Sequence, residues 1–286
     1  MDANYQFLKV DQHQLAYTAF NRHDPRQPII LLHDLTSTIA FWHKGEPYTQ
    51  YGPCYALSLP GHYPAIWPQK FQDDQFSAKE LGRLVGEGIK QLSPERPVTL
   101  IGHGTGGLAA VAAAIQMPAK INRLILVSGF VSGQRGGRFG RLERLAQQNA
   151  SRYVFPLAFL YRYHPTLFRA NIALMVSDRQ AVRNHPDLES LLSLVYPYAQ
   201  RLNVGALWHY FHMLPATDMV YRLPRVAAAT LAISGDKNPV IPPEQSEIIT
   251  SRIPNSQSIM MPGVGHLPMF ERRQVYQQII HNRLGR

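Results

Sequence analysis

The segment 102–107, GHGTGG, has the residue types of a turn that presents a catalytic nucleophile, but it lacks the nucleophile itself. An apolar run at 97–101 precedes it, and an Ala-rich run at 108–117 follows it. When a strand turns sharply into a helix, the residue at the tip of the turn is lifted above the sheet edge, where a serine can attack a carbonyl carbon. The residue at this tip is Gly104, and glycine has no hydroxyl group. The sequence therefore predicts a scaffold for nucleophilic catalysis without the usual serine chemistry.

Four more blocks surround this turn, and the five blocks in this order resemble the α/β-hydrolase superfamily. Residues 29–35 resemble a strand and its oxyanion loop, and residues 55–62 resemble the next strand and its turn. Residues 235–242 resemble the loop that carries the catalytic acid, and residues 263–268 resemble the loop that carries the catalytic histidine. The resemblance covers nearly the whole chain.

The segments that must position these blocks alternate between strand-like and helix-like patterns. This alternation predicts an α/β fold, with a mostly parallel sheet covered by helices on both faces. An antiparallel hairpin is expected within residues 5–20, and one helix is expected over residues 269–284. The segment 129–225 interrupts the alternation. The resemblance implies that it is a helical cap (lid) over the active site, and that residues 1–128 and 226–286 form the hydrolase core.

The resemblance also identifies the catalytic positions that have changed. It places the nucleophile at Gly104, the acid at Asn238 and the histidine at His266, so only the histidine has the expected residue type. Asp34 replaces a glycine that is usual in the oxyanion loop, and Asp236 is an alternative carboxylate for the histidine. Because the members of a triad act as a unit, this degenerate catalytic triad does not predict an acyl-enzyme mechanism.

Other groups at these positions still allow chemistry. The backbone N–H groups of Leu35 and Thr105 are the expected donors of an oxyanion hole, which forms an anion site even without a serine. The amide oxygen of Asn238 is expected to accept a hydrogen bond from the ring of His266. Asp34 either takes part in the chemistry or ties its own loop into a turn.

The cap segment 129–225 holds 14 of the 29 aromatic residues of the chain. A small helical cap cannot bury all of them internally, so several are expected to line the cleft, although each one can equally belong to the core of the cap. This pattern favours an apolar ligand. The predicted substrate-binding residues are His103, Phe130, Phe159, Trp208 and Phe211.

The formal net charge is +10, and the cap contributes twelve arginines, five acidic residues and no lysine. Arg135, Arg138, Arg141 and Arg144 recur among glycines, which predicts a basic loop at the mouth of the cleft. This loop is either a solubilising surface or a contact for the anionic end of an amphipathic ligand or for an anionic membrane surface. No nucleic-acid-binding motif accompanies the charge, so nucleic acid is not an expected partner.

Cysteine content and hydropathy bear on the compartment. A single cysteine, Cys54, excludes an internal disulfide and fits a reducing compartment. The first residues lack the pattern of a signal peptide, and no apolar run reaches the length of about 18 residues that spans a bilayer. We therefore expect a cytoplasmic protein. No motif predicts a cofactor or a metal ion.

Three functions fit these observations. The first is an enzyme in which His266 moves a proton or activates water, as in a lyase or a hydrolase. Its substrate is an apolar small molecule, with or without an anionic group. The second is a hydrolase-fold protein that binds such a ligand without turning it over. The third is a serine ester hydrolase in the form of an inactive Ser-to-Gly variant.

Overall fold

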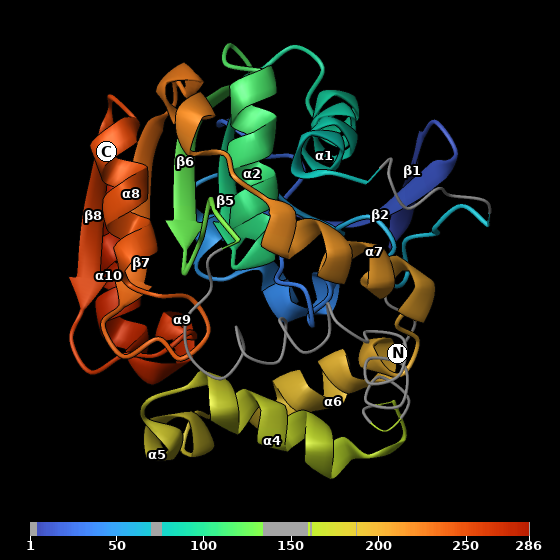
Figure 1. Ribbon diagram of the computed structural model, residues 1–286, viewed down its shortest axis with the longest axis vertical. Helices are drawn as coiled ribbons and strands as arrows, with labels where there is room; N and C mark the ends of the chain where they lie inside the picture. Colours follow the sequence, from blue (N-terminus) through green and yellow to red (C-terminus); the bar gives the residue numbers. More distant parts are fainter. Residues whose placement is uncertain (1–4, 70–75, 134–159, 161, 187, 286) are drawn as a thin grey trace.

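The computed structural model describes residues 5–69, 76–133, 160, 162–186 and 188–285 (Figure 1). Its strands are β1 (Gln6–Val10), β2 (His13–Phe20), β3 (Ile29–Leu32), β4 (Cys54–Leu57), β5 (Val98–His103), β6 (Ile121–Val127), β7 (Ala229–Gly235) and β8 (Ser256–Met261). They form one eight-stranded sheet in the order β1-β2-β4-β3-β5-β6-β7-β8. β1 and β2 form the predicted antiparallel hairpin, and β2 pairs antiparallel with β4. All pairs from β4 to β8 are parallel, which confirms the predicted α/β fold.

Helices cover both faces of this sheet. α1 (Ala78–Leu92), α2 (Thr105–Gln116) and α8 (Glu244–Arg252) contribute to the apolar core on one face. α10 (Arg273–Leu284) and the 3-10 helices η1 (Ile39–Gly45) and η2 (Tyr48–Gln50) contribute to the core on the other face. The expected single helix over 269–284 is wrong in one respect. The backbone leaves the helical region at Arg272 and separates the short helix α9 (Pro268–Glu271) from α10.

The strand residues divide between the two cores by simple alternation. Ile30 and Leu32 face the α1–α2 side, whereas Ile29 and Leu31 face the α10 side. All four are buried, as expected of a parallel strand covered on both faces. The sheet therefore holds the carboxyl ends of β3 and β5 in fixed positions next to each other.

The helices between β6 and β7 do not form one unit. They are α4 (Pro165–Met175), α5 (Arg179–Arg183), α6 (Leu188–Ala199), α7 (Val204–Ala216) and the 3-10 helix η4 (Val220–Arg225). Leu207, Tyr210 and Leu214 of α7 join the main core, and the Tyr210 hydroxyl donates to the carbonyl oxygen of Pro60 at 3.0 Å.

In contrast, α4 and α6 share a separate small apolar cluster. We call these two the roof helices; they lie beneath the sheet in the view of Figure 1. None of the described helices has the combination of length and apolar composition that a membrane span requires.

Candidate active site

The turn between β5 and α2 has the conformation expected of a nucleophile elbow. Gly104 adopts φ +52° and ψ −116°, a region that glycine occupies without steric penalty. Its N–H donates to the carbonyl oxygen of Val127 at 3.0 Å. A Cβ atom on Gly106 would lie 2.6 Å from the carbonyl oxygen of Leu32, so glycine there allows α2 to approach β3 closely. The turn thus retains the elbow geometry although it carries no nucleophilic side chain.

The carboxylate of Asp34 fills the space that an elbow side chain would occupy. A Cβ atom built on Gly104 would lie 2.2 Å from Oδ1 of Asp34. The same oxygen accepts a hydrogen bond from the backbone N–H of Thr105 at 2.6 Å, and Oδ2 lies 3.1 Å from Nε2 of His266. Asp34 therefore contacts the two groups that an elbow serine would be expected to use.

This arrangement corrects the expected role of Thr105. Its N–H was predicted to be an open oxyanion donor, but it is already bonded to Asp34. The second expected donor is Leu35. Its loop is fixed by a hydrogen bond in which Nε2 of His62 donates to the Leu35 carbonyl oxygen at 2.6 Å. The hole that would receive a substrate oxyanion is thus partly occupied by the carboxylate.

Asp34 is ionised despite being almost fully buried. Burial alone would raise its pKa, but the hydrogen bond to His266, the charge of His266 and the hydrogen bond from the Thr105 N–H outweigh this effect. Together they hold the pKa of Asp34 well below its usual range. The backbone of Asp34 is also fixed, because Nδ1 of His33 donates to its carbonyl oxygen at 2.8 Å. The site therefore holds a carboxylate anion in one position.

His266 is fully buried and is held through its main chain. Its N–H donates to the carbonyl oxygen of Met175 at 2.8 Å, and its own carbonyl oxygen accepts from Oγ of Ser128 at 3.0 Å. These bonds leave the imidazole ring in contact with Asp34. The ring of His266 therefore lies beside the Asp34 carboxylate.

Asn238 does not support His266 in the way that was predicted. Its Oδ1 accepts hydrogen bonds from the N–H groups of Val240 and Ile241, each at 3.0 Å, and so caps its own loop. Within the described part of the chain, Nδ2 of Asn238 and Nδ1 of His266 are both buried without a hydrogen-bond partner. The expected hydrogen bond between the two side chains is therefore absent. Asp236 also serves its loop, because it accepts from the N–H of Gly263 at 2.7 Å.

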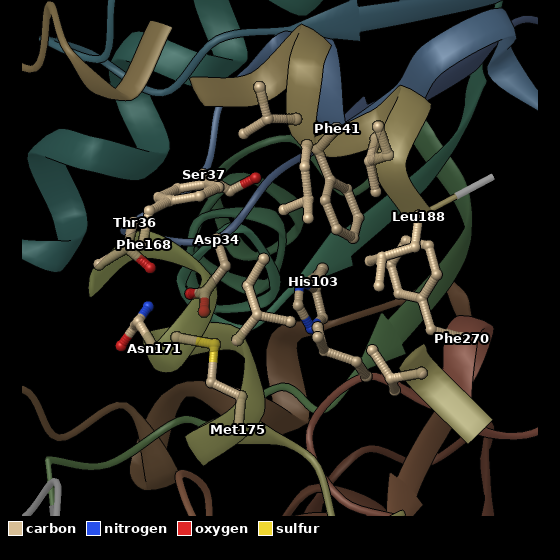
Figure 2. A pocket seen from close by; sticks show the side chains of 16 residues that line it. Asp34, Thr36, Ser37, Phe41, His103, Phe168, Asn171, Met175, Leu188 and Phe270 are labelled. Atoms are coloured by element: carbon tan, nitrogen blue, oxygen red, sulfur yellow. The ribbon is translucent and has the colours of Figure 1, made fainter. Parts of the chain in front are cut away.

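An apolar pocket reaches Asp34 and His103 from the roof helices (Figure 2). Its polar lining residues are Thr36, Ser37 and Asn171 in addition to Asp34 and His103. The apolar lining comes mainly from α4 and α6, with Phe41 and Phe270 on the remaining side. From α4 and α6 the pocket receives Phe168, Ile172, Met175, Leu188, Leu191, Leu192 and Val195.

The predicted substrate-binding residues lie in different parts of the structure. His103 lines the pocket, but Phe130 is buried in the main core, and Phe211 packs against that core. Trp208 contacts the ring of His212 and is not among the lining residues of this pocket. Phe159 and the basic loop with Arg135, Arg138, Arg141 and Arg144 lie outside the described residues. The number of aromatic residues in α7 led to the expectation that this helix lines the pocket. The apolar lining comes instead mainly from α4 and α6.

His103 lines the pocket as a neutral ring. Burial lowers its pKa to about 4, and its Nε2 donates to the carbonyl oxygen of His266 at 3.1 Å. Phe41 stacks on the ring with the centroids 5.5 Å apart. His103 therefore fixes the backbone of the histidine loop and contributes a flat, uncharged surface.

Asp34, His103 and His266 could also hold a metal ion. Each offers one ligand atom, and these atoms lie within 4.8 Å of one another. Two imidazoles and a carboxylate are donors that divalent transition metals accept. A metal ion bound there would replace the hydrogen bond between Asp34 and His266.

The sequence interpretation missed a buried carboxylate, Glu271, which accepts hydrogen bonds from the backbone of two segments next to the site. Its Oε1 accepts from the N–H of Gly265 at 2.9 Å, and its Oε2 accepts from the N–H groups of Ser177 and Asp178 at 2.7 and 2.9 Å. Glu271 thus ties the histidine loop to the segment that follows α4. A lone glutamate after Pro268 gives no sequence signal for such long-range contacts.

Comparisons with known proteins identify the family of the chain. A sequence model described as the alpha/beta hydrolase family matches residues 29–278. The chain belongs to this family.

Curated relatives and solved structures extend the likeness. The chain is 24% identical over 258 residues to the pimeloyl-[acyl-carrier protein] methyl ester esterase of Yersinia enterocolitica, covering 88% of this chain and 91% of that protein. It is 22% identical over 225 residues to the enzyme of the same name from Neisseria meningitidis, covering 78% of this chain but only 65% of that protein. The crystal structure of a hydrolase from Pseudomonas aeruginosa is similar with a TM-score of 0.74, at 20% identity and full coverage of both chains. At this identity the structural likeness shows the fold alone.

Proposed function

We propose that this chain is a serine-less hydrolase in which the Asp34–His266 pair replaces the serine–histidine pair of its relatives. The observation that carries the proposal is the position of the Asp34 carboxylate above Gly104, bonded to the Thr105 N–H and to His266. A charged group is costly to bury, and here it is buried at the end of an apolar pocket. Perturbed, paired groups in such a position are typical of catalytic sites.

The family and its esterase relatives support hydrolysis as the type of reaction. The apolar lining of the pocket supports a small apolar substrate. Gly104 argues against an acyl-serine intermediate, because no described hydroxyl stands at the elbow position. The alternative is a protein that binds a ligand without turning it over, in which Asp34 has no chemical role. A measurement of turnover decides between the two.

The experiment measures turnover of nitrophenyl esters, lactones and 1-bromohexane by the unaltered protein and by Asp34→Asn, His266→Gln and Asp218→Asn. Asp218 is an exposed carboxylate that caps its own loop through the N–H of Val220, so its variant is the matched control. We expect turnover of at least one substrate class, a loss of about 10³-fold or more in kcat/KM for the first two variants, and no loss for the control. Absence of turnover throughout, or turnover that survives both substitutions, would contradict the proposal and favour ligand binding.

A further inference from the structure

We infer that Asp34, His103 and His266 form a binding site for one divalent transition-metal ion such as zinc, at the end of the apolar pocket. The inference rests on the proposed function, because it specifies how the Asp34–His266 pair activates water: a bound ion holds the water molecule. It can fail while the proposed function stands, since the pair can also move a proton without a metal ion.

The spacing between Asp34 and His266 suits two ligands of the same ion. Oδ2 of Asp34 lies 3.1 Å from Nε2 of His266. Two ligand atoms that are each about 2.0–2.1 Å from a zinc ion lie about 2.9 Å apart at a right angle and about 3.4 Å apart in a tetrahedron. The observed distance falls between these two values. An ion can therefore take the place of the hydrogen atom without a large movement of either side chain.

His103 supplies the third ligand atom through a ring nitrogen that the fold leaves unused. Its Nε2 donates to the carbonyl oxygen of His266 at 3.1 Å, and because a carbonyl oxygen only accepts, the hydrogen atom is on Nε2. In the neutral ring Nδ1 then carries a lone pair, and among the described residues this atom is buried without a hydrogen-bond partner. A metal-bound histidine usually donates its other ring N–H to a carboxylate or a backbone carbonyl, as His103 does here.

The three side chains come from segments that are far apart in the sequence. Asp34 follows β3, His103 ends β5, and His266 lies in the loop after β8. One ligand atom from each lies within 4.8 Å of the ligand atoms of the other two. Closing the largest of these gaps to about 3.4 Å needs a movement of at most about 1.4 Å, which small rotations of the side chains supply.

The surroundings of these ligands favour a cation. Oδ1 of Asp34 accepts from the Thr105 N–H at 2.6 Å, which orients the carboxylate and leaves Oδ2 for the ion. The carboxylate is largely buried, and neither lysine nor arginine is among the described residues that line the pocket (Figure 2). Buried charges in proteins are paired or coordinate metal ions. A bound cation therefore stabilises this carboxylate where no ammonium or guanidinium group does.

Three protein ligands leave at least one position on the ion for water, as in catalytic zinc sites. The ion lowers the pKa of that water, so the water loses a proton near neutral pH. The resulting hydroxide adds to the carbonyl carbon of an ester, the bond to the alcohol oxygen breaks, and the alcohol leaves with the proton that the water lost. Ester and water thus give carboxylic acid and alcohol, and the ion is unchanged.

The test measures zinc binding to the full chain, without an affinity tag, after dialysis against a chelator. Calorimetric titration with Zn²⁺ should give one ion per chain with a Kd below about 1 µM. In His103→Gln the amide N–H can keep the hydrogen bond to His266, but no atom takes the place of Nδ1; in Asp34→Asn a neutral amide replaces the anionic ligand. Both variants should bind zinc at least about 100-fold more weakly. His23→Gln, at an exposed histidine, should bind it unchanged.

Thermal unfolding checks that each variant is folded. Absence of a tight site, or a Kd that is the same in His103→Gln and Asp34→Asn as in the unaltered protein, would overturn the inference.

Turnover of a nitrophenyl ester before and after Zn²⁺ is added to the chelator-treated protein separates this inference from the proposed function. Turnover that appears only with zinc supports both. Turnover that is equally fast without zinc, and is still lost in Asp34→Asn, overturns the inference and leaves the proposed function intact. Tight zinc binding with no turnover of any substrate supports the metal site and contradicts the proposed function.

Discussion

The carboxyl edge of the sheet and the roof helices both line the pocket, but different interactions hold them. At the edge, the His33 ring donates to the carbonyl oxygen of Asp34, and the N–H of Gly104 donates to the carbonyl oxygen of Val127, next to a fully buried core. The roof is held by a small cluster of buried residues and by an exposed ion pair between Arg169 and Glu189. Exposed ion pairs contribute little to stability. The comparison indicates that Asp34 and Gly104 are held more firmly than the roof helices.

Glu271 connects these two regions. It accepts hydrogen bonds from the histidine loop through Gly265 and from the end of the roof through Ser177 and Asp178. The main chain of His266 also bonds directly to Met175 in α4. Movement of the roof can therefore reach the catalytic histidine through these contacts, and the predictions below separate the contributions of the two regions.

The largest expected effect is on stability at the sheet edge. Leu100 of β5 is fully buried in the main core, whereas Leu192 of α6 belongs to the small roof cluster. Leu100→Ala should lower the free energy of unfolding by about 3 kcal/mol, and Leu192→Ala should lower it by about 1 kcal/mol, because the smaller cluster can close around the cavity. Urea unfolding of both variants measures this difference. Equal losses would mean that the roof is packed as firmly as the edge.

The second expected effect is a loss of stability in acid that arises at the edge. Burial lowers the pKa of His33 to about 3 and that of His103 to about 4, against an ordinary value of 6.5. Below pH 6.5 the unfolded chain binds protons that the folded chain does not, so the free energy of unfolding falls as the pH falls toward 4. Each of these two histidines should contribute about 2 kcal/mol to the decrease between pH 7 and pH 5.

Two variants assign this pH dependence to its source. Replacing His103 by Asn should flatten the profile, because it removes one of the two histidines, whereas Leu192→Ala in the roof should shift the profile without changing its slope. Urea unfolding at several pH values measures both. A slope that is the same in His103→Asn as in the unaltered protein would contradict the assignment to this residue.

A smaller effect is expected where Glu271 joins the two regions. In Glu271→Gln one carboxylate oxygen becomes an amide NH₂ group that cannot accept, so at least one buried N–H among Gly265, Ser177 and Asp178 loses its partner. The free energy of unfolding should fall by about 1 kcal/mol, and kcat should fall with it because the His266 loop is displaced. Gln277→Glu, at the edge of a separate cavity, serves as a control for the change of charge. Unchanged kcat in Glu271→Gln would show that the roof and the histidine are not coupled.

The sequence predicted the parts of the site that depend on local motifs. The glycines around Gly104 and the position of His266 follow from short segments with characteristic residue types, and both predictions agree with the structure. The position of Asp34 above Gly104 could not be predicted, because it depends on β3 and β5 lying next to each other and on the exact reach of one side chain. Asn238 was assigned to His266 by analogy, but its oxygen caps its own loop.

The roof was predicted less well than the sheet. The many aromatic residues of α7 directed attention to that helix, but Tyr210 and Phe211 pack in or against the main core, and Trp208 contacts His212. A better signal was present in α4, where Phe168, Ile172 and Met175 recur at spacings of four and three and so share one helix face. Helical periodicity identified an apolar face there, and only the three-dimensional structure shows that this face meets Asp34.

The most direct test of the central claim, that Asp34 occupies the place of the nucleophile, is labelling by a fluorophosphonate probe in two variants that differ only at residue 34. Both carry Gly104→Ser and Asn238→Asp, which restore the residue types of a serine triad, and one also carries Asp34→Gly. Because a Cβ atom at residue 104 would lie 2.2 Å from Oδ1 of Asp34, the serine should be blocked while Asp34 is present. We predict that the variant with Asp34→Gly is labelled at Ser at least about 100-fold faster than the variant that retains Asp34. Equal labelling rates in two folded variants would contradict the account.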